Sequence, residues 1–139
     1  MYKTITPQTT QHEQLLTIIE TVCIILEQCG IKNGVMHALV QGATVAIMVQ
    51  ENWDDSLPLM SSIFSAHWFT PGVWLHDTQD GNGDSHLKAG LVGPSKTIPI
   101  IDGQLGLSRW QNIFFCEFDG PRAERHVVRT LIRDADDGR

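Results

Sequence analysis

The sequence lacks the features of several protein classes. It has three cysteines, Cys23, Cys29 and Cys116, and no Cys-x-x-Cys pair, which argues against a disulfide framework or a zinc ribbon and favours buried, reduced thiols. No apolar run approaches the ~20 residues that a membrane-spanning helix needs. Residues 2–6 lack the apolar segment of a secretory signal. These absences predict a cytoplasmic protein.

Basic charge is also scarce. The chain has 10 Lys and Arg against 16 Asp and Glu, a formal net charge of −6 and a pI of about 5.4. This balance argues against nucleic acid or an anionic membrane as a partner. A local positive site for a small anion remains open, because the late part of the chain contains five arginines: Arg109, Arg122, Arg125, Arg129 and Arg133.

Apolar periodicity predicts two helices. Thr10 and Glu13 match a capping box, apolar residues follow at helical spacing, and Gly30 is suited to end this first helix. Asp54 or Asp55 could cap a second helix over residues 54–64.

Alternation of apolar and polar residues predicts strands over 2–6, 35–40, 44–50, 97–101, 104–107, 110–118 and 125–132. The 139 residues are enough for one domain with a real core. We therefore expect a single α+β domain over residues 1–139, mostly antiparallel sheet with two helices packed on one side, and an acidic, frayed tail at 134–139.

The segment 76–90, HDTQDGNGDSHLKAG, is the most polar part of a long stretch, 70–96, with no convincing periodicity apart from a short apolar turn at 87–92. It could hold a metal, cradle a phosphate or form a solvated loop. Residues 80–85 resemble the start of a calcium loop, but Ser85 stands where that loop needs glycine and Leu91 where it needs glutamate. An EF-hand is therefore rejected.

His76 and His86 are ten residues apart, so only a folded-back loop can place them side by side. Together with a carboxylate such as Asp77, Asp84 or Glu51 they would suit a divalent transition metal. The alternative is that both imidazoles are exposed or hydrogen-bonded within a polar loop.

Other candidates each have an equally ordinary explanation. Glu51 follows an apolar strand. A general base or metal ligand is often found at such a strand end, but a charged residue also stands there simply because the chain returns to solvent. Arg122 and Arg125 flank a Gly-Pro turn and could fork onto a phosphate or remain exposed. Trp110 and Gln111 could contact a ligand or only neighbouring protein groups. No P-loop or Ser-His-Asp motif is present.

A series of motifs in fixed order carries a family resemblance. They are Val49-Gln50-Glu51-Asn52, Trp74-Leu75-His76, Ser85-His86-Leu87-Lys88-Ala89, Leu91-Val92-Gly93-Pro94-Ser95, Ile98-Pro99-Ile100, Asp102-Gly103-Gln104-Leu105, Trp110-Gln111 and Glu117-Phe118-Asp119-Gly120-Pro121-Arg122. In this order the chain resembles the secondary thiamine-phosphate synthase family, also called YjbQ-like, from about Gly34 to Ile132.

The resemblance implies a homotrimer of small α+β subunits with sites near subunit boundaries. It also implies a weak transferase activity that joins a pyrimidine pyrophosphate to a thiazole phosphate with loss of pyrophosphate. The implied site residues are Glu51, His76, His86, Ser95, Trp110, Gln111 and Arg122 or Arg125. Within that set we expect Glu51 or His86 to transfer a proton, His76 and His86 to bind a divalent metal, and the others to bind the ligand.

Two departures from the family pattern weaken this expectation. Gly42 stands where the family usually has a histidine, with Gln50 in place of an asparagine, and Ser108-Arg109 replaces the usual Gly-Thr. The alternative function is therefore a non-catalytic, trimeric metal- or anion-binding protein of the same fold.

Overall fold

The computed structural model describes residues 2–51 and 81–137 of the chain. Two helices are described, α1 (Ile19–Cys29) and α3 (Gly83–Val92). The strands are β1 (Tyr2–Ile5), β2 (Gln14–Thr17), β3 (Gly34–Val40), β4 (Val45–Glu51), β5 (Ser95–Ile101), β6 (Gln104–Leu105), β7 (Gln111–Glu117) and β8 (Val127–Arg133). In this described part, no helix is long and apolar enough to cross a membrane.

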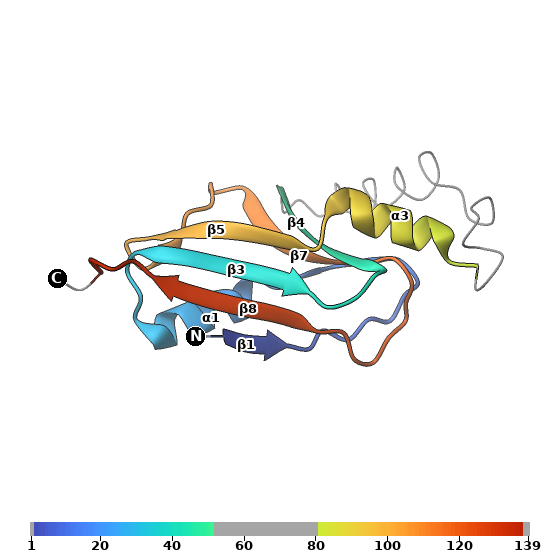
Figure 1. The fold of residues 1–139 in the computed structure, drawn as a ribbon, viewed down its shortest axis with the longest axis horizontal. Coiled ribbons are helices and arrows are strands. Elements are labelled where there is room, and N and C mark those ends of the chain that lie inside the picture. The colour runs from blue at the N-terminus through green and yellow to red at the C-terminus, as the bar shows by residue number, and fades with distance from the viewer. Residues whose placement is uncertain (1, 52–80, 138–139) are drawn as a thin grey trace.

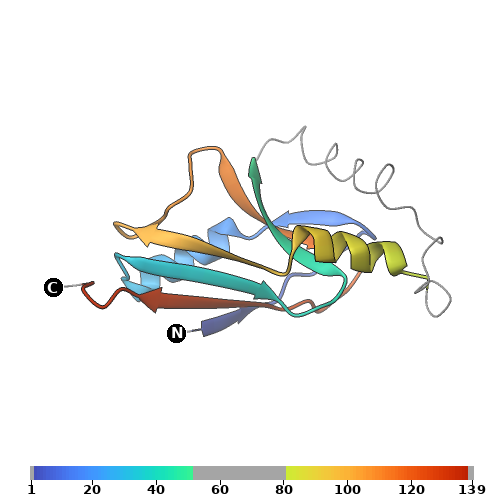
Figure 2. The ribbon, with the colours of Figure 1, turned by 45° about the horizontal axis from the view of Figure 1, so that its top comes forward.

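The strands form two antiparallel sheets. The larger sheet has five strands in the order β1-β8-β3-β5-β6, and the smaller has three in the order β2-β7-β4. Figure 1 shows the larger sheet in front, with α1 behind it and α3 beyond one end of β3, and Figure 2 shows the same arrangement with its top turned forward. The hairpin between β5 and β6 turns at Asp102 (φ 51°) and Gly103 (φ 79°). Such left-handed residues match the twist of the flanking strands.

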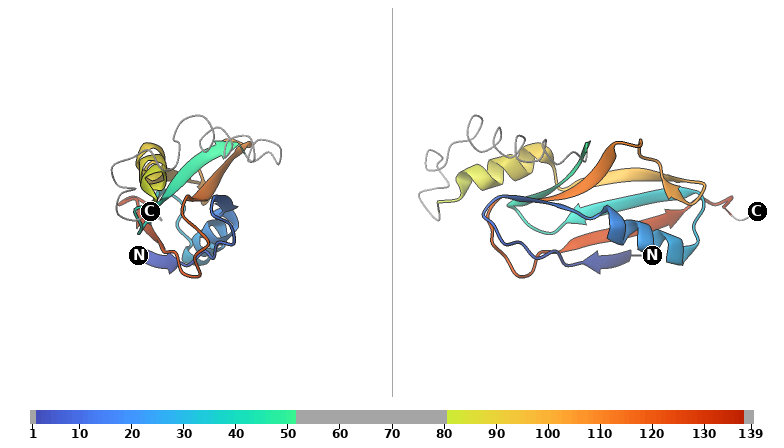
Figure 3. Two further views of the ribbon diagram at one scale, coloured as in Figure 1. Left: turned by 90° about the vertical axis from the view of Figure 1, so that its right-hand side faces the viewer. Right: turned by 180° about the vertical axis from the view of Figure 1, so that it is seen from behind.

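The main core lies between α1 and the inward faces of the two sheets (Figure 3). Its buried side chains alternate along the strands, as in Met36, Ala38 and Val40 of β3. A second, smaller apolar cluster joins α3 to the other face of β4 and β7, with Ala89 packing near Phe114. The smaller sheet is therefore covered on both faces, which fixes the place of α3.

The structure confirms a single α+β domain of mostly antiparallel strands with two helices. All seven predicted strands are present, with ends that differ from the prediction by a few residues. The predicted second helix at 54–64 lies outside the described residues. Part of the expected tail is described, and there the backbone N–H groups of Lys32 and Asn33 donate to the carboxylate of Asp137 at 3.1 and 3.0 Å.

The prediction for the first helix is wrong at its start. The helix begins at Ile19 rather than after Thr10, and Gln14–Thr17 is strand β2, paired with β7. Leu16 packs on the main core, whereas Leu15 packs on the second cluster. Neighbouring leucines that serve opposite faces follow a strand period of two, not a helical period.

The capping box is wrong for the same reason. The backbone N–H of Thr10 donates to the side chain of Gln14 at 2.9 Å, and the Glu13 carboxylate accepts a bond from Lys88. The predicted end of the helix is confirmed. Gly30 has φ 65°, and its N–H donates to the Leu26 carbonyl at 3.2 Å.

The largest difference concerns the polar segment. Only a short turn at 87–92 was expected, yet Gly83–Val92 is a regular helix. His86 therefore lies on a helix and not in a loop. The part of the segment before residue 81, including His76, lies outside the described residues.

Candidate functional site

A buried charged triad fixes helix α3. Lys88 is fully buried, and its Nζ lies 2.8 Å from Asp84 Oδ2 and 2.6 Å from Glu13 Oε1. Burial by itself lowers the pKa of Lys88, but hydrogen bonds to Asp84 and Glu13 outweigh it and leave the pKa above its ordinary value. Because Glu13 precedes β2, the triad ties α3 to the N-terminal segment.

The first turn of α3 is bound to the chain that leaves β7. The Ser85 hydroxyl donates to the Phe118 carbonyl at 2.6 Å, and Asn82 Nδ2 donates to Asp119 Oδ2 at 2.8 Å. His86, one residue beyond Ser85, donates its backbone N–H to the Asn82 carbonyl at 3.3 Å. His86 therefore lies one helical turn beyond Asn82, the residue that binds the Asp119 carboxylate.

Three polar residues, His12, Asn82 and Arg122, surround that carboxylate, and together with Asp119 we call them the Asp119 cluster. Arg122 Nη2 lies 3.3 Å from Asp119 Oδ2, and Arg122 Nε donates to the Asp119 carbonyl at 3.1 Å. His12 Nδ1 lies 3.9 Å from Asp119 Oδ1. The Arg122 side chain is 53% exposed, so its guanidinium is held in position and still reaches solvent. Such a cation can contact a phosphate.

The second predicted arginine has a different environment. Arg125 Nη2 lies 2.7 Å from Glu117 Oε2, its Nε donates to Glu117 Oε1 at 3.0 Å, and Nη2 also donates to the Thr44 hydroxyl at 2.9 Å. A Cβ atom at Gly42 would lie 3.3 Å from Arg125 Nη1. The predicted ligand-binding arginine is thus engaged within the protein, beside Gly42.

Three further predicted residues form a separate exposed group at the far end of the smaller sheet. Glu51 and Gln111 are cross-strand partners of β4 and β7. Gln111 Oε1 accepts the Ser108 N–H at 2.9 Å. The guanidinium of Arg109 lies 4.9 Å from the ring centre of Trp110, which is 64% exposed. Arg109 therefore stacks on a predicted ligand contact.

These two groups do not meet within one chain. Val45 pairs with Glu117 at one end of the β4–β7 ladder, and Glu51 pairs with Gln111 at the other. Six residue steps at about 3.3 Å each separate the ends by roughly 20 Å. His86 and Arg122 lie near the Glu117 end. Ser95 begins β5 opposite Leu39 in the larger sheet, in neither group.

The described residues include one of the two histidines that are expected to bind a metal. His86 is on α3, and His76 lies outside the described residues. Over residues 2–51 and 81–137, no three His, Cys, Asp or Glu side chains converge on a position for a metal. Within the same residues, the buried Asn82 Oδ1 has no hydrogen-bond partner, so it could accept a bond from a ligand or contact a cation.

Sequence reasoning missed the residues that hold the site together. Sequence patterns do not single out Glu13, Lys88 and Glu117 as ion-pair partners, and they indicate Asp119 only as part of a turn and of a family motif. The spacing of Asp84 and Lys88, four residues apart, is typical of a helical ion pair. That signal becomes useful only once 83–92 is recognised as a helix.

Comparison with protein families settles the relationship that these motifs suggest. A family model described as "UPF0047 protein YjbQ-like" matches residues 3–134. The chain belongs to the YjbQ-like UPF0047 family. A UPF0047 protein of Methanothermobacter thermautotrophicus is 37% identical over 118 residues, 85% of this chain and 82% of the relative. YugU of Bacillus subtilis is 30% identical over 139 residues, 94% of this chain and 99% of YugU.

Solved structures share the YjbQ-like fold. A hypothetical protein of Aeropyrum pernix is 30% identical, with a TM-score of 0.91 over 96% of this chain and 99% of its own. A YbjQ-like protein of unknown function from Sulfolobus solfataricus is 31% identical, with a TM-score of 0.84 over 96% of this chain and 97% of its own. These likenesses establish the family and the fold.

Proposed function

We propose that this protein is a transferase of the secondary thiamine-phosphate synthase type, acting on phosphorylated small molecules at a site shared between subunits of a homotrimer. The observation that carries the proposal is the separation of the candidate residues into two groups at opposite ends of β4 and β7. A cyclic trimer joins two different surfaces of each subunit. It can therefore place Glu51, Trp110 and Gln111 of one subunit against the His86 and Arg122 end of the next.

Each side of such a site has a distinct task. Loss of pyrophosphate develops negative charge on the leaving oxygen, and a positioned cation stabilises it. Arg122 supports this role because Asp119 holds the guanidinium while half of the side chain stays exposed. Glu51 or His86 transfers the proton. Arg125 has a positioning role and does not contact the substrate, because its guanidinium is bound to Glu117 and Thr44.

A complementation assay tests both the chemistry and the shared site. Thiamine-phosphate formation is measured for the wild type, Glu51→Gln and His86→Ala, and for the two variants after unfolding and refolding together. We expect each variant alone to be inactive and the mixture to regain activity, because about a quarter of the interfaces then combine an intact Glu51 with an intact His86. Mixed variants that stay inactive, beside an active wild type, would contradict the shared site. An inactive wild type would withdraw the transferase chemistry.

A second candidate function is a non-catalytic, trimeric protein that binds a metal or an anion. It is favoured by Gly42, which replaces the family's histidine, and by Arg125 Nη1, which lies 3.3 Å from the Cβ that a histidine would bring. Calorimetry with inorganic phosphate and with manganese distinguishes the two candidates. Phosphate binding that Arg122→Gln removes, in a wild type without turnover, supports the binding protein. Light scattering near the monomer mass of 15.5 kDa would contradict both, because each requires the trimer.

A further inference from the structure

A cavity of about 340 Å³ lies between α1 and the chain that leads from β6 into β7. Helix α1 forms one side of it, and residues between 103 and 111 form the other. Its apolar walls are the side chains of Ile19, Leu26, Leu105 and Leu107. A cavity of this size, with apolar walls and a few polar groups, suits a small organic ligand. Of the described residues that line it, only Gln111 is among the predicted site residues.

One end of the cavity lies beside Glu51. The N–H of Ile18 donates to the Ile113 carbonyl at 3.0 Å, which brings the start of α1 to the start of β7. Gln111 lines the cavity there, and its cross-strand partner is Glu51. Both residues lie on the same face of the sheet as Ile113 and Val49, which belong to the main core. Directly opposed residues have Cβ atoms about 5 Å apart, so the proposed proton-transfer group is next to the cavity.

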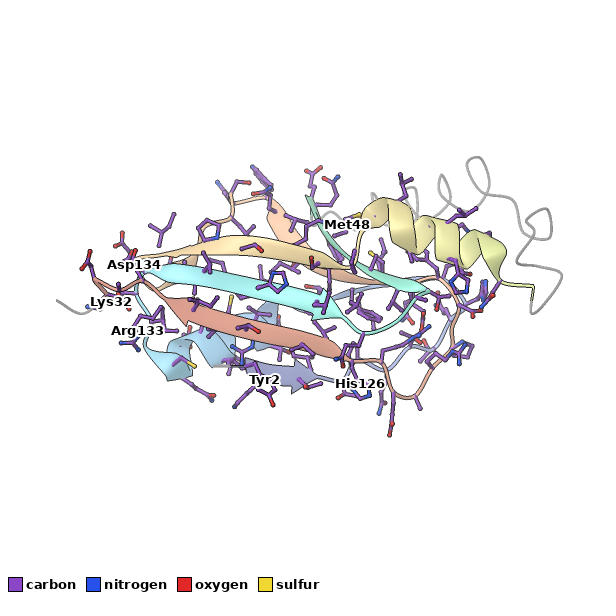
Figure 4. The ribbon with its side chains drawn as sticks, in the orientation of Figure 1. Tyr2, Lys32, Met48, His126, Arg133 and Asp134 are labelled. Atoms are coloured by element: carbon purple, nitrogen blue, oxygen red, sulfur yellow. The ribbon has the colours of Figure 1, made fainter. Side chains whose placement is uncertain are left out.

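The opposite end of the cavity has a carboxylate. Glu27 lines the cavity and is eight residues beyond Ile19 on α1, which is roughly 12 Å along a helix. The Gly103 N–H donates to the Lys32 carbonyl at 2.8 Å, so the turn between β5 and β6 meets the chain that leaves α1. Figure 4 shows Lys32 at this end of the molecule. The cavity is therefore elongated, with Glu27 far from Glu51.

The two ends of the cavity have side chains of opposite charge. Arg109 lines the cavity next to Gln111, with its guanidinium 4.9 Å from the ring centre of Trp110. Among the described residues, neither Arg109 nor Glu27 belongs to an ion pair. Gln111 Oε1 accepts the Ser108 N–H, which leaves the amide NH₂ of Gln111 to donate to a ligand. An anion is thus favoured at this end and an amine at the Glu27 end.

We propose that this cavity binds a phosphorylated small amine, with its amino group at Glu27, its apolar body between the leucines and its phosphate at Arg109 and Gln111. The inference rests on the proposed function, because it names the substrate class of the Glu51 side of that site. The phosphate then lies beside Glu51 and faces the Arg122 end of the neighbouring subunit in the proposed trimer. Glu27 determines specificity, since a neutral group in place of the amine does not pair with its carboxylate.

The first test compares three probes that differ by one charged group. Calorimetry measures the binding of tyramine O-phosphate to the wild type, together with ethylphenyl phosphate, which lacks the amine, and tyramine, which lacks the phosphate. We expect tyramine O-phosphate to bind about fivefold more tightly than either, because each exposed ion pair contributes up to about 1 kcal/mol. Equal affinities for the two phosphates would overturn the role of Glu27, and no binding of tyramine O-phosphate would overturn the proposal.

Variants then assign each end of the ligand to a side chain. Glu27→Gln should lower the affinity for tyramine O-phosphate to that for ethylphenyl phosphate and leave the latter unchanged. Arg109→Gln should weaken both phosphates about fivefold and leave tyramine unchanged. Glu20→Gln is the matched control, because Glu20 is an exposed carboxylate on the same helix. An equal effect of Glu20→Gln, or none of Glu27→Gln, would overturn the assignment of the amine to Glu27.

The last test locates the ligand with a thiol and needs no variant. Cys23 lines the cavity, whereas Cys29 on the same helix lines a different one. At ten times its Kd, tyramine O-phosphate should slow the alkylation of Cys23 by iodoacetamide about tenfold and leave Cys29 unaffected. Equal slowing of both thiols, or of neither, would overturn the location.

These readouts separate the cavity from the transferase chemistry. Protection of Cys23 in a wild type that forms no thiamine phosphate would sustain the cavity and remove only the transferase. Thiamine-phosphate formation whose KM is the same in the wild type and in Glu27→Gln would sustain the transferase and overturn the cavity as its substrate site.

Discussion

Glu117 and Arg125 form a two-point ion pair inside the protein, with Nη2–Oε2 at 2.7 Å and Nε–Oε1 at 3.0 Å. Glu117 is fully buried and Arg125 is 12% exposed. The Thr9 hydroxyl also donates to Glu117 Oε1 at 2.8 Å, and the Thr44 hydroxyl accepts from Arg125 at 2.9 Å. The pair therefore joins the N-terminal segment, the approach to β4 and the end of β7 at one point.

We expect Arg125→Met to lower the free energy of unfolding by about 3–5 kcal/mol, because it leaves the Glu117 carboxylate buried without its cation. Urea denaturation measures this change. Arg122→Met is the matched control, since the exposed pair of Arg122 with Asp119 should contribute less than about 1 kcal/mol. Equal losses in the two variants would contradict the interior role of Arg125.

The double variant Glu117→Gln with Arg125→Met sharpens this prediction. It removes both charges together, so no uncompensated carboxylate remains, and we expect it to be more stable than Arg125→Met alone. A double variant that is less stable would mean that Arg125 contributes through packing rather than through charge.

Lys88 gives a prediction about alkaline pH. Its pKa is raised above 10.5 because the hydrogen bonds to Asp84 and Glu13 outweigh the effect of burial. The charged lysine thus stabilises the folded protein fully below pH 10.5 and loses this effect as pH rises through the folded pKa. We expect the difference in unfolding free energy between the wild type and Lys88→Met to be constant from pH 7 to about 10 and to shrink above that.

The buried thiol of Cys116 leads to a second prediction about the pH dependence of stability and to one about thiol labelling. Burial raises the pKa of its thiol from 9.0 to about 12, so above pH 9 the unfolded chain loses a proton that the folded chain keeps. Stability should therefore decrease as pH rises from 9 towards 12, and Cys116→Val should lack this contribution. At pH 8, a thiol reagent should label Cys116 only as fast as the protein unfolds. Labelling should therefore be faster in the less stable variant Arg125→Met. Rapid labelling of the native wild type would refute this.

The strands could be predicted because their burial alternates. In β3 and β5 the inward positions are apolar, as in Met36, Ala38 and Ile98, and a period of two is a local signal. The start of α1 could not be predicted, because Leu15 and Leu16 pack on different clusters. Their spacing also fits the helical pattern that continues through α1, and only the presence of β7 as a partner decides in favour of a strand.

Helix α3 escaped prediction for a different reason. Its inward face contains Asp84, Ser85 and Lys88, which are polar residues that sequence patterns assign to solvent. They are buried because Glu13 and the Phe118 carbonyl complete their bonds, and neither partner is near in sequence. The same holds for the site: residue types and family motifs named Arg122 and His86, but only the fold shows which groups hold them.

Gly42 supplies the last prediction, because placing a histidine there is not a neutral change. A Cβ at this position would lie 2.9 Å from Val45 Cγ2 and 3.3 Å from Arg125 Nη1. We expect Gly42→His to lower the free energy of unfolding by about 1–3 kcal/mol, and Val45→Ala to reduce that cost when the two are combined. Gly90→Ala is the control: a Cβ there meets nothing within 4 Å, so it should be neutral or stabilise α3 by up to about 1 kcal/mol. A Gly42→His chain as stable as the wild type would mean that Arg125 can move away from residue 42, and that variant could then be used to measure the effect of a histidine at this position in the transferase assay.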